Sequence, residues 1–249
     1  METILPCYLS CGDIDHKFVY GFNLTPDGSK DHQFQERLQV FRMKITECVQ
    51  CDSFPCTDVN HAGYLVPSID VNPEKVSCVI ISEAAPEDPA SYYYAPGQPL
   101  FQQNTVQAFL SGGVEVASFQ ELLAIGTYFT TAVKCAKMGY NIKTGTIKQC
   151  SKLLEKELDL LIRVKAYLLM GDVAIKAINY IARRTGGKRA IPTGSTYKIR
   201  GGEFYFHGVR TFPSYLHVGP SYGIEKSKQR MIAEDIAMAM SLIKSDPPN

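Results

Sequence analysis

The chain has 249 residues, of which 45% are hydrophobic and 20% charged, and its formal net charge is +1. This composition is typical of a soluble globular protein with a large core, and it excludes an overall positive field that would attract nucleic acid. No apolar run is long enough to cross a membrane, and residues 1–6 lack the basic start and apolar run of a secretory signal. We therefore expect a cytoplasmic protein without membrane contact.

Patterns of apolar residues and turn signals predict strands that alternate with helices. In chain order we expect a helix over 33–46, a strand over 76–81, a short helix with a capping box at Ser118-Phe119-Gln120-Glu121, a strand over 128–134, a long amphipathic helix that begins at Cys150, a strand over 167–170, a helix over 173–181, a hairpin over 198–206 that turns at Gly201-Gly202, a strand over 209–212 and a helix over 226–243.

This alternation predicts an α/β fold with three layers, in which a mainly parallel central sheet of about four strands has helices on both faces. No internal repeat or linker divides the sequence, so we expect a single domain over 1–249. Residues 1–45 have a weak pattern and are interpreted as an N-terminal extension of that domain.

Eight cysteines are many for a cytoplasmic chain, where disulfides are rare and clustered cysteines more often bind metals or act in catalysis. Cys48 and Cys51 form a close pair, and Cys135 and Cys150 each lie at the end or start of a predicted element. Spacing alone leaves open whether the last two are metal ligands or ordinary buried residues. A pair with two distant single cysteines fits an iron–sulfur cluster better than zinc, which is the lesser alternative. Cys7 and Cys11 are a further close pair.

Five short motifs in order resemble the iron–sulfur (family four) uracil-DNA glycosylases: Ser82-Glu83-Ala84-Ala85-Pro86, Thr130-Thr131-Ala132-Val133-Lys134-Cys135, Cys150, Met170-Gly171 and Phe212-Pro213-Ser214-Tyr215-Leu216. The resemblance covers about residues 45–243, and in it the Cys-x2-Cys pair at Cys48 and Cys51 comes before the five motifs. It implies a uracil-DNA glycosylase-like fold and a structural [4Fe–4S] cluster held by Cys48, Cys51, Cys135 and Cys150.

The resemblance also implies a base pocket, in which three residues depart from the family. Thr131 stands where the family has the Asn that reads uracil, and Phe212 stands where it has a His. Leu100 replaces the stacking Phe, a role for which Phe101 or one of the tyrosines over 92–94 is an alternative. The expected pocket comprises Ala84, Leu100, Phe101, Thr131 and Phe212. Because Thr offers one short hydroxyl instead of an amide, we expect a damaged or modified base rather than uracil.

Carboxylates follow the strand predicted over 76–81, at the sheet edge where active sites of α/β proteins usually lie. Glu83 matches the family's Glu, and Glu87 and Asp88 match the acidic pair that follows it, so all three are candidate catalytic residues. The alternative is that they are solvated loop carboxylates. His217 and His207 are candidates to replace the lost imidazole.

DNA is the expected partner of a monomeric protein. Arg183, Arg184 and Arg189 are candidates for a clamp on the DNA backbone, and the alternative is a solvated loop after a helix. Pro213, Ser214, Tyr215 and Leu216 are candidates for a wedge that enters the duplex. The sequence therefore predicts a DNA glycosylase-like enzyme, or alternatively an inactive nucleic-acid or nucleobase binding protein that keeps the fold and the cluster.

Overall fold

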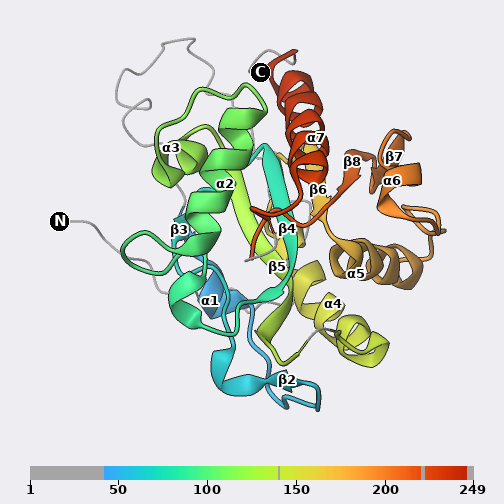
Figure 1. Ribbon diagram of the computed structural model, residues 1–249. Coiled ribbons are helices and arrows are strands. Elements are labelled where there is room, and N and C mark those ends of the chain that lie inside the picture. Colours follow the sequence, from blue (N-terminus) through green and yellow to red (C-terminus); the bar gives the residue numbers. More distant parts are fainter. Residues whose placement is uncertain (1–41, 140, 220–221, 246–249) are drawn as a thin grey trace, which may run out of the picture. The chain divides into compact units, whose positions relative to one another are not determined.

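The computed structural model describes residues 42–139, 141–219 and 222–245, and Figure 1 shows it as a ribbon. Most of the helix predicted over 33–46 lies outside the described residues, as do Cys7, Cys11 and most of the predicted extension over 1–45. From Arg42 onward the chain forms one unit by its internal contacts. Among the described residues, no helix combines the length and the apolar character that a membrane span requires.

A mixed six-stranded sheet organises the described residues, in the order β2, β5, β4, β6, β8, β7. The inner strands run parallel to one another: β4 pairs in parallel with both β5 and β6, and β6 pairs in parallel with β8. The edge strands β2 and β7 are antiparallel to their neighbours. The strands span Val59–Asn60 (β2), Cys78–Ala85 (β4), Thr127–Lys137 (β5), Ala166–Met170 (β6), Phe204–Phe206 (β7) and Val209–Ser214 (β8), and a separate antiparallel pair joins Met43–Lys44 (β1) to Asp70–Val71 (β3).

Apolar side chains alternate along the inner strands and contribute to two hydrophobic cores. In β4, Val79 and Ile81 belong to the core that includes residues of helices α4 and α5, whereas Cys78 and Ile80 belong to the core with helices α2, α3 and α7. These helices span Leu100–Ser111 (α2), Phe119–Ala124 (α3), Thr144–Asp159 (α4), Asp172–Arg184 (α5) and Lys226–Ser245 (α7). The connections hold short helices at Ile45–Cys48 (α1), His61–Gly63 (η2), Pro89–Ser91 (η3) and Thr196–Ile199 (α6). The predicted α/β class is confirmed.

Several local predictions are confirmed. Strands occur within 76–81, 128–134 and 167–170, and the C-terminal helix begins at Lys226. The predicted Ser118 cap also forms, since the Glu121 N–H donates to Ser118 Oγ at 3.3 Å. The return bond of the capping box does not form as expected, because Glu121 Oε2 accepts from the Ala117 N–H, at 2.9 Å, and not from the N–H of Ser118.

Other local predictions are wrong. Met43–Lys44 is a strand where a helix was expected, and α4 begins at Thr144, so that Cys150 lies in its second turn instead of opening it. Strand β4 continues to Ala85, which places Glu83 on a strand and not in a loop. The C-terminal hairpin joins β7 to β8. It turns at His207-Gly208, where φ is 48° and 80°, and Gly201-Gly202 instead follow α6.

Candidate functional site

The thiols of Cys51, Cys56, Cys135 and Cys150 are near enough to affect one another's pKa, and Cys48 ends the helix α1 that packs beside α4; we call these five residues the cysteine cluster. Burial is the largest cause that raises the pKa of the Cys135 thiol to about 12, and nearby thiols add to it, namely Cys150, Cys51 and Cys56. Thiols act on each other's pKa in this way only at short range. Cys48 ends α1, which packs against α4, and its side chain meets the apolar core that contains Cys135 and Cys150.

A β-bulge allows strand β5 to contribute to this cluster. Ala84 of β4 lies opposite Val133, but Ala85 lies opposite Ala136, so Lys134 and Cys135 have no residue of β4 opposite them. In a regular strand, two consecutive side chains point to opposite faces of the sheet. Here both meet α4, because Lys134 pairs with Glu157 of that helix and Cys135 shares a core with its Cys150. Bulges re-aim side chains in this way next to functional sites.

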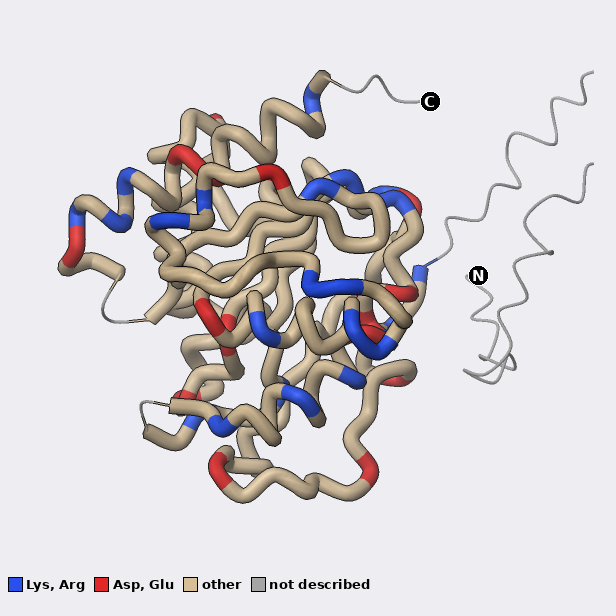
Figure 2. The backbone as a smooth tube through the Cα atoms, turned by 90° about the vertical axis from the view of Figure 1, so that its right-hand side faces the viewer, with Lys and Arg blue, Asp and Glu red and all other residues tan. Residues whose placement is uncertain are grey.

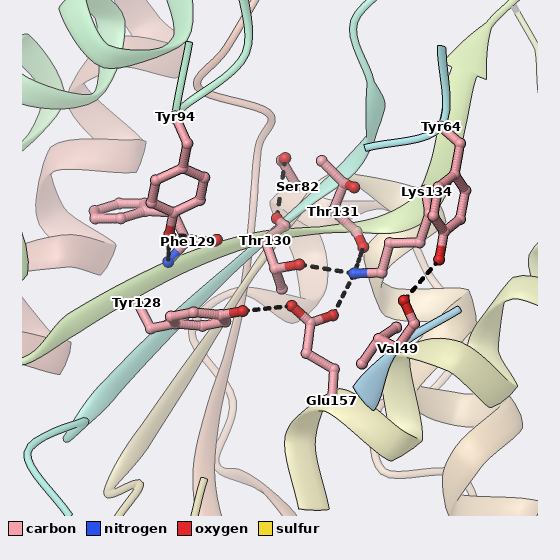
Figure 3. Close-up of polar contacts among 10 residues, drawn as sticks. All are labelled: Val49, Tyr64, Ser82, Tyr94, Tyr128, Phe129, Thr130, Thr131, Lys134 and Glu157. Atoms are coloured by element: carbon pink, nitrogen blue, oxygen red, sulfur yellow. Dashed lines mark hydrogen bonds and ion pairs between the residues drawn. The ribbon is translucent and has the colours of Figure 1, made fainter. Parts of the chain in front are cut away.

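Aromatic rings hold the loop between Cys51 and Cys56. The ring of Phe54 packs edge-on against Tyr64, with centroids 5.3 Å apart, and against His61 at 5.2 Å. Tyr64 OH donates to the backbone oxygen of Val49 at 3.0 Å, and Figure 3 shows this contact beside Lys134. Burial raises the pKa of Tyr64 most, and thiols of the cysteine cluster raise it further. The Tyr64 hydroxyl therefore lies near these thiols.

The donors of the cysteine cluster fit an iron–sulfur cluster, because thiolates are the usual ligands of such clusters. Cys48, Cys51, Cys135 and Cys150 would hold it, and Cys56 is an additional thiol. Within the described ranges, no three His, Cys, Asp or Glu side chains converge on a position for one metal ion. That finding concerns a mononuclear site such as zinc, which needs thiolates about 2.3 Å from one point, whereas an iron–sulfur cluster distributes its thiolates over several irons.

Glu83 lies at the carboxyl edge of the sheet, next to the beginning of α5. Its Oε1 accepts from the Val173 N–H at 3.5 Å, and its Oε2 lies 3.9 Å from the Lys137 ammonium. The chain passes this carboxylate at Gly171, where φ is +101° and an added Cβ would lie 2.6 Å from Glu83 Oε1. The Glu83 side chain is 18% exposed. A carboxylate at a helix N-terminus, with a cation beside it and partial access to water, is suited to act on a developing positive charge.

The other two candidate carboxylates lie apart from this arrangement. Glu87 and Asp88 are both exposed, in the connection after β4. Asp88 Oδ1 accepts from the Ala90 N–H at 3.0 Å and caps the short helix η3. This contact is sufficient to account for Asp88 as a turn residue.

The residues predicted to form the base pocket are mostly buried. Leu100 is 38% exposed at the start of α2, whereas Ala84, Phe101, Thr131 and Phe212 are buried. Phe101 and Phe212 share the core beneath α2 and α7, and Thr131 Oγ1 is buried without a hydrogen-bond partner. Glu83 instead faces the N-terminus of α5, which packs in the opposite core. Phe101 and Phe212 thus lie in one core, and Glu83 faces the other side of the sheet.

His217 is buried beneath α2. Its Nε2 lies 3.0 Å from Thr105 Oγ1 and 3.4 Å from Tyr93 OH. Thr105 donates its own proton to the Phe101 carbonyl at 2.6 Å, so it accepts from His217 Nε2. Burial lowers the pKa of His217 to about 3, which keeps the ring neutral. Its Nδ1 is buried without a partner. His207 lies elsewhere, in the turn between β7 and β8.

The predicted arginine clamp lies at the edge of the sheet opposite to Glu83. Helix α5 begins beside Glu83 and ends with Arg183 and Arg184, and its 13 residues span about 20 Å. Arg184 is engaged by Glu155, with Nε 2.7 Å from Oε2, whereas Arg183 and Arg189 are exposed. Figure 2 shows basic positions on this side of the chain interspersed with acidic ones, rather than gathered in one stripe.

The four residues predicted to form the wedge differ in their exposure, and Leu216 is half-buried. Pro213 and Ser214 are buried in strand β8, where Ser214 Oγ donates to Asp235 Oδ2 at 2.6 Å. Asp235 also binds Arg200, at 2.7 Å from Nη2, so this segment is fixed in the core. Tyr215 is half-buried, with the Lys228 ammonium 5.5 Å from its ring centroid.

Two features of the site were not found from the sequence. Cys56 carries no spacing motif and lines a cavity of about 460 Å³ with Asp58 and Lys143. Lys134 forms a buried ion pair with Glu157, although its place in a strand gave no sign of that (Figure 3).

Neither the protein-family models nor the curated proteins compared with this chain match it. The resemblance to the iron–sulfur uracil-DNA glycosylases is therefore carried by the order of its motifs.

Proposed function

We propose that the protein is a cytoplasmic, DNA glycosylase-like enzyme with a uracil-DNA glycosylase-like fold and a [4Fe–4S] cluster. It hydrolyses the N-glycosidic bond of a damaged or modified base in DNA. The observation that carries the proposal is the cysteine cluster, in which Cys51 and Cys56, from the segment after α1, lie near Cys135 of β5 and Cys150 of α4. Glu83 supports it, because this carboxylate lies at the carboxyl edge of the neighbouring strand β4.

The cluster supplies structural cross-linking when bound. Through it, Cys48 and Cys51 would connect the start of the described chain to Cys135 of β5 and Cys150 of α4. These contacts would fix β5, whose Thr131 lies opposite Ser82 of β4 in the sheet register.

Glu83 is the residue assigned to the chemistry. Release of a base from deoxyribose develops positive charge on the sugar, and a positioned carboxylate stabilises that charge and orients the attacking water. The target nucleotide must first leave the base stack. Thr131 carries one hydroxyl where an amide would read uracil, so a base with a different pattern of donors and acceptors is the expected substrate.

A second candidate function is binding of nucleic acid or a nucleobase without hydrolysis. The burial of Thr131 and Phe212 favours the form of this candidate that binds nucleic acid without flipping a base, because a flipped base needs room beside them. Two cavities, of about 180 and 460 Å³, are lined by other residues.

The test uses protein purified without oxygen. Iron and labile sulfide in equal amounts, with little zinc, are expected, and stoichiometric zinc would overturn the cofactor. The loaded protein is then incubated with oligonucleotides that contain uracil, hypoxanthine or xanthine, and abasic product is measured. Release from a modified base that Glu83→Gln abolishes, and Glu87→Gln does not, supports the enzyme. DNA binding without product on any substrate supports the second candidate.

A further inference from the structure

A cavity of about 180 Å³ lies at the far end of α5 from Glu83, at the amino edge of the sheet. Its floor is apolar, because Leu158 in the last turn of α4 and Ile181 in the last turn of α5 line it, and both are buried. The buried rings of Tyr167 and Phe206 also line it and meet edge to face, with centroids 5.7 Å apart. The helices α4 and α5 pack against each other, so the cavity lies where both of them end (Figure 1).

The rim of this cavity holds a carboxylate without a counter-charge. Asp159 ends α4, where the helix dipole is negative and an acidic residue is unfavourable. Among the described residues, Asp159 has no hydrogen bond or ion pair, whereas the other carboxylate of the cavity, Glu155, is paired with Arg184. Burial and then the charge of Glu155 raise the pKa of the Asp159 carboxyl. None of the described residues that line the cavity is a lysine or an arginine. The arrangement therefore favours a cation that comes from outside the chain.

The Tyr167 hydroxyl is a second polar group of this cavity that lacks a partner. Tyr167 is only 6% exposed and lines the cavity, and no hydrogen bond joins its hydroxyl to another described residue. Buried tyrosine hydroxyls usually have such a partner. Burial raises the pKa of Tyr167 to about 12, and the charge of Asp159 adds to it, so the two groups are near each other. A ligand that donates hydrogen bonds would satisfy both.

His207 completes the rim with a further acceptor. Its backbone takes a φ of 48°, which is uncommon outside glycine, and its ring stacks on Phe206 with centroids 4.0 Å apart. Its Nε2 lies 3.1 Å from Thr185 Oγ1, and that hydroxyl donates its own proton to a carbonyl oxygen in the last turn of α5, at 3.2 Å. The Nε2 atom therefore carries a proton, and Nδ1 of the neutral ring is left as an acceptor.

We propose that this cavity binds a primary alkylammonium ion, with the ammonium group at Asp159 and Tyr167 and the alkyl chain on the apolar floor. An ammonium group has three donors and no acceptor, which matches this rim. Aromatic rings also attract a cation, and the floor gains from contact with an aliphatic chain. The ligand carries one charge, because Glu155 is already paired. At about 30 Å³ for each water-sized group, the cavity holds a ligand of about six non-hydrogen atoms. This inference is independent of the cysteine cluster and of Glu83.

The test is a titration of the purified protein with n-pentylamine at about pH 7 and low ionic strength, followed by ligand-observed NMR. The neutral alcohol n-pentanol has the same chain and should bind about tenfold more weakly, as expected for the loss of a charged hydrogen bond. Asp159→Asn should weaken n-pentylamine binding by about tenfold and Tyr167→Phe by about fivefold. Asp70→Asn is the matched control, because Asp70 is an exposed carboxylate outside the cavity, and it should leave the affinity unchanged.

The melting temperature of the ligand-free variant separates a ligand site from a structural role. Asp159→Asn removes a charge that opposes the helix dipole, so the free variant should melt at the same temperature as the parent or higher. A lower melting temperature would assign Asp159 to the fold and overturn the inference. Equal n-pentylamine affinity of the parent and Asp159→Asn, or equal affinity for n-pentanol, would overturn it as well.

A blocked lysine, Nα-acetyl-lysine methylamide, distinguishes two sources of the same ammonium chemistry. Tighter binding of the blocked lysine than of n-pentylamine supports the site with a lysine side chain of a partner protein as its ligand. Tighter binding of n-pentylamine supports it with a free amine. Binding of neither compound would overturn the inference.

Discussion

Gly171 and Glu83 provide a test of the carboxyl-edge geometry that does not depend on activity. Gly171 has φ 101° and ψ 167°, a conformation that is essentially restricted to glycine. A Cβ at this position would lie 2.6 Å from Oε1 and 2.8 Å from Cγ of Glu83. Gly171→Ala therefore strains the backbone and also displaces the carboxylate from the start of α5.

The magnitude follows from two contributions. Backbone strain of this kind costs about 1–3 kcal/mol, and a carboxylate at a helix N-terminus stabilises by about 0.3–1 kcal/mol. Gly171→Ala is therefore expected to lower the free energy of unfolding by about 1–4 kcal/mol, and the melting temperature by about 3–16 °C for a chain of this size.

A double-mutant cycle measured by urea unfolding separates these contributions. Glu83→Ala removes the side chain that an alanine at position 171 would meet, so the double variant should be less destabilised than the sum of the single variants. We expect a coupling of about 0.5–1 kcal/mol. Gly186→Ala is the control, because Gly186 also has a positive φ, +84°, but an added Cβ would meet nothing within 4 Å. Its cycle with Glu83→Ala should be additive.

Additive free energies for the Gly171 and Glu83 variants, within about 0.3 kcal/mol, would refute the reasoning. They would show that the carboxylate does not lie against this glycine. Glu83 would then lose the positioning on which its assigned role depends.

Other variants test the rest of the described structure. Because burial lowers the pKa of His217 to about 3, the unfolded chain binds a proton below about pH 6.5 that the folded chain does not. The free energy of unfolding therefore falls by up to about 1.4 kcal/mol per pH unit on acidification. His217→Gln should make the decline measured by urea unfolding between about pH 6.5 and pH 4 shallower by up to about 1.4 kcal/mol per pH unit. Asp58 accepts from the Lys143 N–H at 2.7 Å, at the start of α4. Asp58→Ala should therefore lower the free energy of unfolding in urea by about 1 kcal/mol, and an unchanged midpoint would show that this contact does not stabilise the start of the helix. Ser214→Ala removes the hydrogen bond to Asp235 and should cost about 1 kcal/mol while DNA affinity in a binding titration stays the same; a selective loss of affinity would restore Ser214 to the DNA interface.

The sequence predicted the inner strands because their apolar, β-branched runs are buried on both faces. The same reasoning ended β4 too early, since Ser82 and Glu83 are polar although the strand continues to Ala85. Glu83 is accommodated there because it faces a helix N-terminus rather than the core. Composition does not contain that information, which depends on where α5 begins relative to β4.

The hairpin shows a similar limit. Gly201-Gly202 is a strong turn signal, yet the turn occurs at His207-Gly208, where His207 takes a positive φ. Residues 204–206 pair with 209–211, and this pairing selects the turn from outside the local sequence. In the same way, the proximity of Cys135 and Cys150 could be expected from the motif order. The part played by Cys56 and by the ion pair of Lys134 depends on tertiary contacts.

The bulge in β5 has a consequence for changes in chain length. Between Val133 and Ala136, two residues have no counterpart on β4, and both of them contact α4. A substitution at either position removes one contact. Deletion of Lys134 keeps every apolar residue of the sheet, yet it leaves a single side chain at the bulge to make both contacts. Relatives that keep the sheet but differ in length here should therefore lose the cysteine cluster and the ion pair together, so this loop-like stretch inside a strand is expected to tolerate insertions and deletions least.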